Sequence, residues 1–423
     1  MRPTITPDEE DRLGSLAVVL PLALAGFVAV SGGWSLLAVA GVYLTDALSL
    51  SGLQFGLLLA MPMAVGATLA VPSGLAAQKF GARRIMMLCL GGLAICMLLL
   101  MGADSFAGFV LAGAGLGLAG GYYSAGLQFV TQHSPPYCLG LVLGVFGAGI
   151  TGVGVSYYLV PLILDAFSWP IVPLAYLIVL VLVLVLLTLL TDDDDACEKT
   201  LVETSIPQVL VRLARVQLWR VAGWFGVVAG SFFAMAFWLP DYLSSQFELS
   251  VERGALMAQW FVIPGALAQV LGGFLADRVG SARVISRALL VCLAALFLLS
   301  YPPMTLSIKG VEGLISIEFS LPLRLEIVLI MILAFALGTA MAGLQRKMVV
   351  ENREATAFTA GVLLVSACTV AFLLPLVFGA ANDWFGVRNA VFMILFLLLA
   401  ACLVLFARDH RRSERRRLLH PGI

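Results

Sequence analysis

Five polar or amphipathic side chains lie inside long apolar stretches of this sequence: Trp34, Tyr122, Gln128, Gln269 and Gln345. Indole, phenol and amide groups are uncharged at neutral pH but form hydrogen bonds, so they suit recognition of a small solute better than covalent chemistry. A polar group without a partner in apolar surroundings costs free energy, which makes such residues candidates for function. We predict that they line a central substrate cavity, with Gln269 as the leading candidate.

Other kinds of chemistry leave no pattern in the sequence. The seven cysteines are scattered without ligand-like spacing, and we find no phosphate-binding loop, activated nucleophile or cluster of metal ligands. The net charge is zero, so no overall positive field would attract nucleic acid. We therefore predict a protein that is not an enzyme, has no cofactor or bound metal, and binds a small molecule or ion rather than nucleic acid.

A glycine-rich basic turn occurs twice, 199 positions apart, each time after an apolar stretch. Basic groups beyond a helix can pair with acidic groups or helix C-termini of a second body, and such contacts would break when two bodies rock. We interpret the turns as a gating motif; the alternative is that their charges only fix orientation in a membrane. The motif residues are Gly74, Lys79, Gly81, Arg83 and Arg84 in the first copy, and Gly273, Asp277, Arg278, Gly280 and Arg283 in the second.

Between the two turns, glycines recur mostly at four-residue spacing. Small residues at positions i and i+4 of a helix let two helix backbones approach closely in a membrane. We predict such close helix packing at Gly113, Gly117, Gly121, Gly140, Gly144, Gly149 and Gly154.

Long apolar helices must position all of these residues. The chain is 61% hydrophobic and 12% charged, whereas a soluble domain has about a quarter charged residues. Each spanning helix needs roughly 20 apolar residues, and only helices satisfy their backbone groups in lipid when period-2 alternation is lacking. The sequence predicts an all-α integral membrane protein with spans at 14–45, 52–77, 85–103, 106–130, 139–164, 170–191, 219–246, 252–276, 284–302, 326–345, 356–381 and 387–407.

Charge divides the chain into two sets of six helices. The run Asp192–Asp195 opens a polar stretch, which predicts an N-terminal half at 1–191, a cytoplasmic linker at 192–217 and a C-terminal half with a basic tail at 218–423. With both termini in the cytoplasm, 21 of the 25 Lys and Arg residues face that side, as the positive-inside rule requires. Residues 303–325 are an outer insert whose alternating pattern suggests a short hairpin.

Twelve helices in two pseudo-symmetric six-helix halves, each with this turn after its second helix, resemble the major facilitator superfamily. The second turn matches the family motif Gly-x-x-x-Asp-Arg/Lys-x-Gly-x-Arg/Lys-Arg/Lys, whereas the first has Gln78 at the acidic position. The glycine-rich fifth helix, Phe80-Gly81-Ala82-Arg83-Arg84 and Leu374-Pro375-Leu376-Val377-Phe378-Gly379 resemble the nitrate/nitrite porter branch. The resemblance implies the major facilitator fold and alternating access, with the turns helping to hold one state of the cycle.

The resemblance fails at the positions where that branch binds its anion. Nitrate porters use one arginine in helix two and one in helix eight, because a desolvated oxyanion needs charge-assisted donors in a fixed geometry. By their flanking residues, those two positions of the substrate cavity are Ala70 and Gln269 here. We therefore expect a small inorganic ion or small neutral solute as the substrate, but not nitrate carried by the family's mechanism.

Three functions remain open. The leading one is a monomeric secondary transporter in the bacterial inner membrane, or an invagination of it, driven by a gradient because no nucleotide-binding sequence is present. We expect no buried carboxylate, which favours facilitation or exchange over proton coupling, and leaves Asp241 as the one acidic candidate. A loose resemblance to magnetosome porters implies a metal-ion (iron) transporter as an alternative. The other alternative is a non-transporting sensor or scaffold that kept the fold and lost the site.

Overall fold

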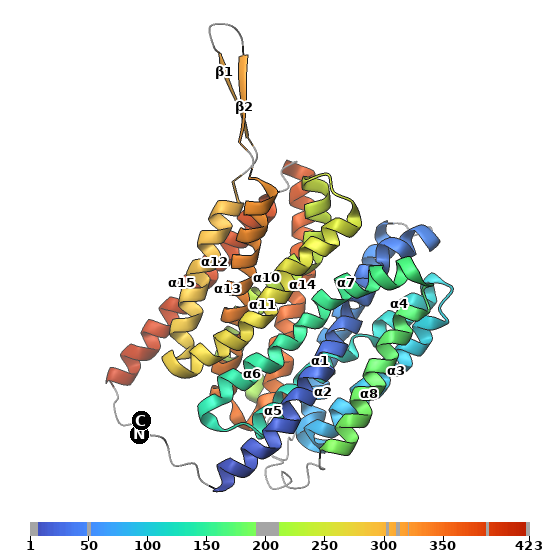
Figure 1. The fold of residues 1–423 in the computed structure, drawn as a ribbon. Coiled ribbons are helices and arrows are strands. Elements are labelled where there is room, and N and C mark those ends of the chain that lie inside the picture. Colours follow the sequence, from blue (N-terminus) through green and yellow to red (C-terminus); the bar gives the residue numbers. More distant parts are fainter. Residues whose placement is uncertain are drawn as a thin grey trace.

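Twelve apolar helical segments that are long enough to cross a membrane form the structure, a computed structural model (Figure 1), and this confirms the predicted number. Most of the predicted linker, residues 192–210, lies outside the described residues. The described residues are 7–48, 52–191, 211–301, 304–309, 314–319, 321–385 and 389–419.

The first half, defined here as the helices before the linker, contains six spans, of which the fourth and fifth are interrupted at glycines. The fourth span consists of α4 and α5, and the fifth consists of α6 and α7 joined by a 3-10 turn. The elements are α1 (Pro7–Leu48), α2 (Gly52–Phe80), α3 (Ala82–Met101), α4 (Phe106–Gly115), α5 (Leu118–Gln132), η1 (Pro136–Cys138), α6 (Leu139–Gly147), η2 (Ala148–Ile150), α7 (Thr151–Ala166) and α8 (Ile171–Leu190).

The second half, after the linker, contains six further spans and the outer insert. The insert forms an antiparallel pair of strands, β1 (Met304–Lys309) and β2 (Leu314–Phe319), in which Met304 lies opposite Phe319. The hairpin suggested by the alternating pattern is therefore present. The helices are α10 (Val216–Gln246), α11 (Val251–Val279), α12 (Ser281–Leu299), α13 (Leu323–Glu351), η4 (Arg353–Ala355), α14 (Thr356–Phe385) and α15 (Ala390–Leu419).

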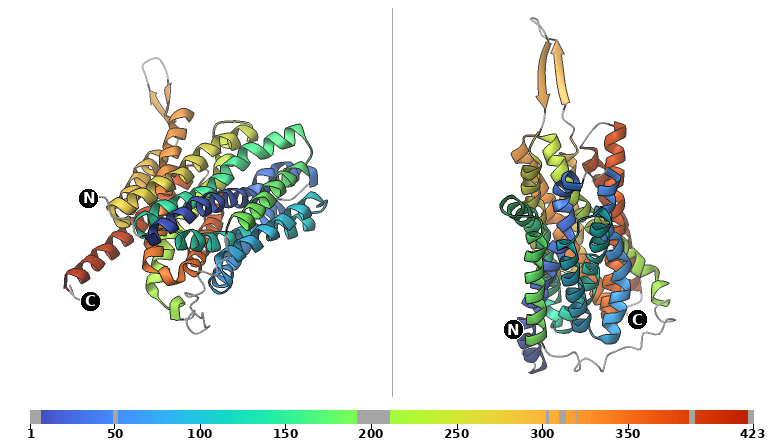
Figure 2. Two further views of the ribbon diagram at one scale, coloured as in Figure 1. Left: turned by 60° about the horizontal axis from the view of Figure 1, so that its bottom comes forward. Right: turned by 90° about the vertical axis from the view of Figure 1, so that its right-hand side faces the viewer.

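The two halves lie side by side with their helices running between two ends of the bundle (Figure 1). The β1–β2 hairpin projects from one end, which we call the hairpin end (Figure 2). The helix α1 begins and α15 ends at the opposite end, near the two glycine-rich turns. We call this opposite end the basic end, because the turns carry the motif's Lys and Arg residues.

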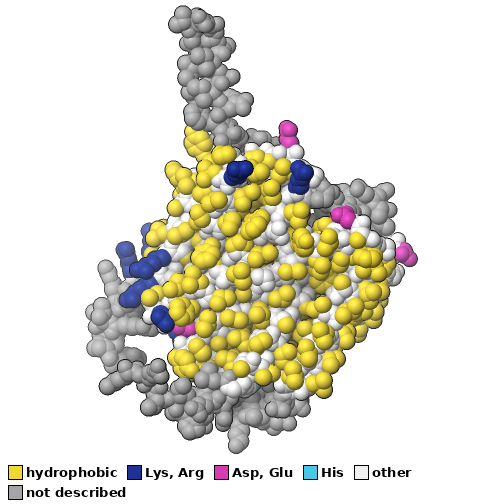
Figure 3. All heavy atoms as spheres, viewed as in Figure 1, with side chains coloured by type: hydrophobic (Ala, Val, Ile, Leu, Met, Phe, Trp, Pro, Cys, Tyr) yellow, Lys and Arg dark blue, Asp and Glu magenta, His cyan; other side chains and the backbone are white. Residues whose placement is uncertain are grey.

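Apolar side chains cover the flank of the bundle between its two ends (Figure 3). Leu88, Leu111, Phe297 and Leu397, from four different helices, are each more than two thirds exposed. A continuous apolar surface of this size is incompatible with water and matches the hydrocarbon region of a bilayer. The packing therefore fits a protein whose helices present an apolar outside to lipid and enclose their polar side chains between them.

The two turns have the same backbone geometry. Gly81 joins α2 to α3 with φ 94° and ψ 140°, and Gly280 joins α11 to α12 with φ 90° and ψ 140°. Side chains other than glycine rarely adopt this positive φ, so each turn requires glycine at its corner. The duplication seen in the sequence thus extends to the backbone conformation of both turns.

Candidate functional site

The backbones of the two halves touch where α2 packs against α14, a contact that we call the α2–α14 seam. A methyl group placed on Gly74 would overlap the carbonyl oxygen of Ala357, and one on Gly361 would lie 2.6 Å from the carbonyl oxygen of Ala70. Ala70 itself is fully buried. Only hydrogen at positions 74 and 361 permits this approach, as expected where helices pack through small residues.

An equivalent contact, the α6–α11 seam, joins the halves on the other side. A methyl group on Gly273 would overlap the carbonyl oxygen of Gly140, and one on Gly144 would overlap that of Gln269. Gly273 and Gln269 are the repeat equivalents of Gly74 and Ala70. The two seams are therefore pseudo-symmetric, and both close the interface between the halves toward the basic end.

Asp277 links the halves across the α6–α11 seam. Its carboxylate accepts hydrogen bonds from the backbone N–H groups of Gly140 (2.9 Å) and Leu141 (2.8 Å), at the start of α6. Arg346 on α13 donates its Nε to the same carboxylate at 2.6 Å, and the Asp277 side chain is 7% exposed. A carboxylate at a helix N-terminus satisfies unpaired N–H groups and the helix dipole, so this acid fastens α6 to the second half.

Four basic residues of the motif make contacts within their own halves. Arg83 is buried and donates to Thr191 Oγ1 (2.7 Å) and to the Thr188 carbonyl (2.9 Å), which ties α3 to the end of α8. Its neighbour Arg84 is exposed. Exposed Lys79 and Arg278 lie over the rings of Phe80 and Phe274, and exposed Arg283 donates to the Val279 carbonyl.

The first copy of the motif lacks the acidic link. Gln78 occupies the position of Asp277 and is 8% exposed, but neither polar atom of its amide has a hydrogen-bond partner among the described residues. Unpaired buried polar groups cost about 1–3 kcal/mol each. The α2–α14 seam is consequently held by close packing, and no ion pair like that of Asp277 joins α2 to α14 in the described part of the chain.

Replacing Gln78 by Met should raise thermal stability. Met has a similar volume and removes both unpaired amide atoms, so we expect a gain of about 1 kcal/mol, which is a rise of a few degrees in melting temperature. Melting of purified wild type and variant in the same detergent would measure this gain. A lower melting temperature would show that the amide has a partner, such as bound water, and would contradict the assignment.

Two fully buried glutamines meet at the centre of the interface. Gln269 on α11 donates its Nε2 to the carbonyl of Gly147 at 3.0 Å, and Gln345 on α13 donates its Nε2 to the hydroxyl of Tyr123 at 2.9 Å. The Oε1 atoms of both glutamines have no hydrogen-bond partner among the described residues. Both oxygens lie close to Gly147, because a methyl group there would overlap Gln269 Oε1 and lie 3.3 Å from Gln345 Oε1.

The 3-10 turn in the fifth span accounts for the position of Gln269. The turn η2 interrupts the α-helical bonding between α6 and α7, and such turns expose carbonyl groups to other donors. The Gly147 carbonyl accepts from Gln269, and the Gly149 carbonyl accepts from Ser31 Oγ at 2.7 Å. Side chains from α11 and α1 thus bind carbonyl groups at and beside this turn.

The remaining predicted cavity residues lie at different places. Trp34 is 8% exposed, and its ring packs edge-on against Phe233 of the second half at 5.7 Å between ring centroids. Tyr122 donates to the carbonyl of Ala23 within the first half, and Gln128 is buried. Neither Trp34 Nε1 nor Gln128 Oε1 has a hydrogen-bond partner within the described ranges. The structure therefore brings Gln269 and Gln345 together, with Tyr123 and Gly147 completing the group.

The predicted packing glycines make close contacts of two kinds. Gly140, Gly144 and Gly154 contact α11 across the interface, with Ile263 the neighbour of Gly154. The others pack inside the first half: Gly113 against Leu37, Gly117 against Gly66 and Val65, Gly121 against Ser73 and Cys89, and Gly149 against Phe27.

One expectation from the sequence is wrong: the bundle does contain buried carboxylates. Besides Asp277, Glu326 on the first turn of α13 is 2% exposed and accepts from the Tyr242 hydroxyl at 2.5 Å. The sequence analysis placed the start of this helix at residue 326, so Glu326 stood at its end. The helix α13 in fact begins at Leu323, which places Glu326 within its first turn. Because buried carboxylates are present, their burial gives no preference for facilitation over proton coupling.

Twelve spanning helices in two pseudo-symmetric sets, with polar side chains meeting between the sets, are the architecture of alternating-access transporters. A family model agrees with this architecture: that of the Major Facilitator Superfamily matches residues 22–346. The chain belongs to this superfamily of membrane transporters, which points to solute transport rather than to enzymatic catalysis.

Relatives found by sequence and a solved structure agree with this membership. The chain is 26% identical over 395 residues to the probable nitrate/nitrite antiporter NarK1 of Thermus thermophilus, covering 90% of this chain and 89% of that protein. It is 28% identical over 262 residues to the nitrite extrusion protein of Bacillus subtilis, covering 62% and 65%. The transporter FucP, solved in the outward conformation, shares the fold with a TM-score of 0.70 at 15% identity, covering 93% of this chain and 99% of that one.

Proposed function

We propose that this protein carries a small solute with hydrogen-bond donors through a site formed by Gln269, Gln345, Tyr123 and Gly147. One observation carries the proposal: two buried amide oxygens from the second half, both without a hydrogen-bond partner in the described part of the chain, lie close to one glycine of the first half. Buried polar groups that lack partners are destabilising unless a ligand satisfies them in another state. A site shared by both halves is also where alternating access requires the substrate to bind.

The orientation of the Gln269 amide supports a site made of acceptors. The Gly147 carbonyl can only accept a hydrogen bond, so the NH₂ group of Gln269 must face it. The Oε1 atom of Gln269 consequently points away from that carbonyl, toward the side of Gln345. A solute or ion bound between them would meet carbonyl-type oxygens, which suit N–H or O–H donors and small cations.

Nitrate and nitrite fit this site poorly, although the named relatives are associated with them. A desolvated oxyanion needs charge-assisted donors, and Ala70 and Gln269 supply no charge. Arg346 follows Gln345 in sequence, but its guanidinium is bound to Asp277. The group at Gly147 thus favours a small cation such as ammonium, or a neutral solute with several donors.

The transport cycle would move residues 1–191 against residues 218–423, with the seams opening and closing the basic end. We propose that the basic end faces the cytoplasm of a bacterium, that both termini lie there, and that the protein works as a monomer in the inner membrane. The distribution of Lys and Arg supports this orientation. The glycine contacts and Asp277 at the basic end support the idea of a gate there.

Replacing Gln269 by Leu should abolish transport while leaving the fold intact. Leu keeps most of the side-chain volume but removes both the anchor to Gly147 and the unpartnered oxygen, so we expect at least a roughly tenfold loss of flux. Wild type and variant would be reconstituted in proteoliposomes, with uptake of radiolabelled methylammonium, urea and nitrate as probes. Gln259→Leu, a half-buried glutamine on the same helix, is the matched control.

Three outcomes decide between the candidate functions. Saturable methylammonium or urea uptake that fails in Gln269→Leu but persists in Gln259→Leu supports the proposal. Saturable nitrate uptake that depends on Gln269 would overturn the substrate class while keeping the site. Uptake unaffected by Gln269→Leu would overturn the site itself.

A non-transporting sensor or scaffold is the second candidate. The observation in its favour is that central residues are buried and that the halves also touch toward the hairpin end, where the Tyr157 hydroxyl donates to the Ala236 carbonyl at 2.9 Å. Absence of flux for any probe in folded wild-type protein would support it. The iron-transport alternative gains no support, since the described residues contain no group of three potential metal ligands.

A further inference from the structure

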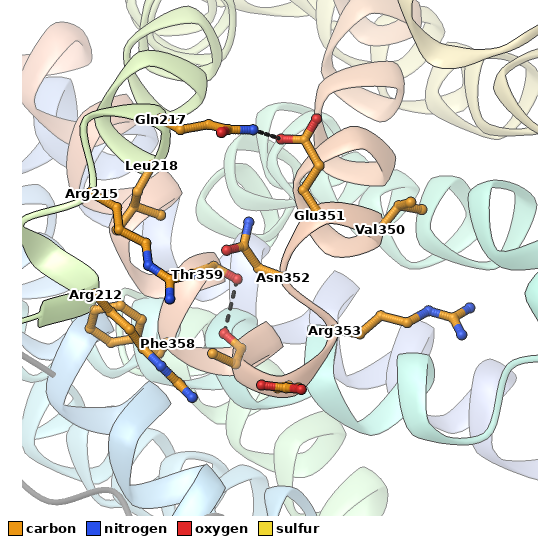
Figure 4. Close-up of a pocket in the computed structure, with 12 residues that line it drawn as sticks. Arg212, Arg215, Gln217, Leu218, Val350, Glu351, Asn352, Arg353, Phe358 and Thr359 are labelled. Atoms are coloured by element: carbon orange, nitrogen blue, oxygen red, sulfur yellow. Dashed lines mark hydrogen bonds between the residues drawn. The ribbon is translucent and has the colours of Figure 1, made fainter. Parts of the chain in front are cut away.

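A pocket with a volume of about 430 Å³ opens at the basic end, and the central glutamines are not among its lining residues (Figure 4). It lies between the segment that leads into α10 and the turn that joins α13 to α14. In Figure 4, Arg212 and Arg215 extend from the first of these walls, and Asn352 and Arg353 belong to the second. Pockets of about 300–1,000 Å³ are the usual size of small-ligand sites.

Positive charge predominates in this pocket. Three arginines line it, against the two acidic residues Glu351 and Glu354. Glu351 is already engaged, because Lys347 forms an ion pair with it and Gln217 donates to it at 3.2 Å. By contrast, no ion pair joins Arg212, Arg215 or Arg353 to any partner in the described part of the chain.

The guanidinium groups of Arg212 and Arg215, on one wall, match the chemistry of a phosphate group, whereas Arg353 extends from the other wall away from them (Figure 4). Each guanidinium can donate two parallel hydrogen bonds to phosphate oxygens. The amide groups of Gln217 and Asn352 on the same walls already donate to Glu351 and to Met348. The pocket also lies at the end of the bundle where the spanning helices leave the hydrocarbon region. Basic pockets at this depth meet the phosphates of anionic lipid headgroups as well as soluble phosphate.

We propose that this pocket binds a phosphate group, presented either by an anionic lipid or by a soluble phosphate compound. The site is separate from the one at Gly147, and its binding does not depend on which solute is transported. Phe358 lines the pocket on α14, and a methyl group on Gly74 would lie 3.2 Å from the Cα atom of this same residue. A ligand in the pocket therefore contacts Phe358, whose backbone belongs to the α2–α14 seam, and would hold that seam closed.

Binding can be measured directly on the whole purified protein. Native mass spectrometry would count retained phosphatidylglycerol and phosphatidylcholine molecules, and calorimetry would measure binding of inorganic phosphate. We expect the variant with Arg212, Arg215 and Arg353 all changed to Gln to bind its phosphate probe at least roughly tenfold more weakly. Glu354→Gln removes an opposing charge and should tighten binding, which tests the site without removing any arginine.

The control changes the same amount of charge at the same end of the bundle. Arg287, Arg411 and Arg412 are exposed and do not line the pocket, so their joint replacement by Gln should leave binding unchanged. Retention of phosphatidylglycerol alone identifies a lipid headgroup as the ligand, and a calorimetric signal with inorganic phosphate identifies a soluble one. The proposal is overturned if neither probe binds wild type, if the control triple weakens binding equally, or if Glu354→Gln has no effect.

Discussion

Replacing Gly273 by Ala is expected to force the two halves apart at the basic end and to stop the transport cycle. The added methyl group would overlap the Gly140 carbonyl oxygen and lie 2.7 Å from its carbon, and these backbone atoms cannot rotate away as a side chain can. Overpacking of this kind costs about 1–3 kcal/mol, so at about 2 kcal/mol the closed state would lose roughly thirtyfold in population. We expect flux to fall by a comparable factor.

Cys138 offers a direct readout of this opening. It lies half-buried beside the start of α6, close to the Gly140 contact, whereas the other cysteines in the described residues are buried. In a background with Cys197→Ser, Gly273→Ala should accelerate labelling of Cys138 by a water-soluble maleimide. Gly223→Ala is the control, because a methyl group there meets nothing within 4 Å. Equal labelling rates in Gly273→Ala and Gly223→Ala would refute the seam as a closed contact.

Replacing Asp277 by Asn should weaken the same end of the bundle by a different route. The carboxylate holds two N–H groups of α6 and the guanidinium of Arg346, and its side chain is 7% exposed. Removing one partner of a largely buried ion pair costs about 3 kcal/mol, because the other charge is left without compensation. We therefore expect a lower melting temperature and faster labelling of Cys138.

A double-mutant cycle separates this link from general damage. Arg346→Gln alone should also destabilise, but the pair Asp277→Asn with Arg346→Gln should cost less than the sum of the two. Asp409→Asn provides the contrast, because its ion pair with Arg220 is exposed, and exposed pairs contribute at most about 1 kcal/mol. Additive effects of Asp277→Asn and Arg346→Gln would show that the two residues do not act together.

The sequence predicted the membrane helices and their repeats well, because those features are periodic. Apolar runs defined the twelve spans, and strand-like alternation located the hairpin. Four-residue spacing identified Gly140 and Gly144 of the α6–α11 seam, whereas Gly361 of the α2–α14 seam was not predicted. The match between the two turns required only a comparison of the chain with itself. Each of these signals lies in the sequence pattern itself, so it can be recognised without the three-dimensional structure.

Contacts between distant residues could not be predicted in this way. Asp277 binds backbone groups 136 and 137 positions away, and Gln345 meets Tyr123 across 222 positions. The 3-10 turn beside Gly147 has no distinct signature within a glycine-rich run, although it decides where Gln269 donates. The sequence thus identified the glutamines as polar residues in apolar helices, while their common neighbour emerged only from the packing.

The difference between Gln78 and Asp277 gives the two seams unequal resistance to separation. Parting α2 from α14 breaks contacts between uncharged backbones, whereas parting α6 from α11 must expose a carboxylate and uncap a helix. The halves should therefore separate unevenly. We expect them to rotate about the α6–α11 side, so that the α2–α14 side opens furthest. Solute leaving the centre would then pass beside Ala70 and Gly361, so the two repeats, although alike in outline, do not share the exit route equally.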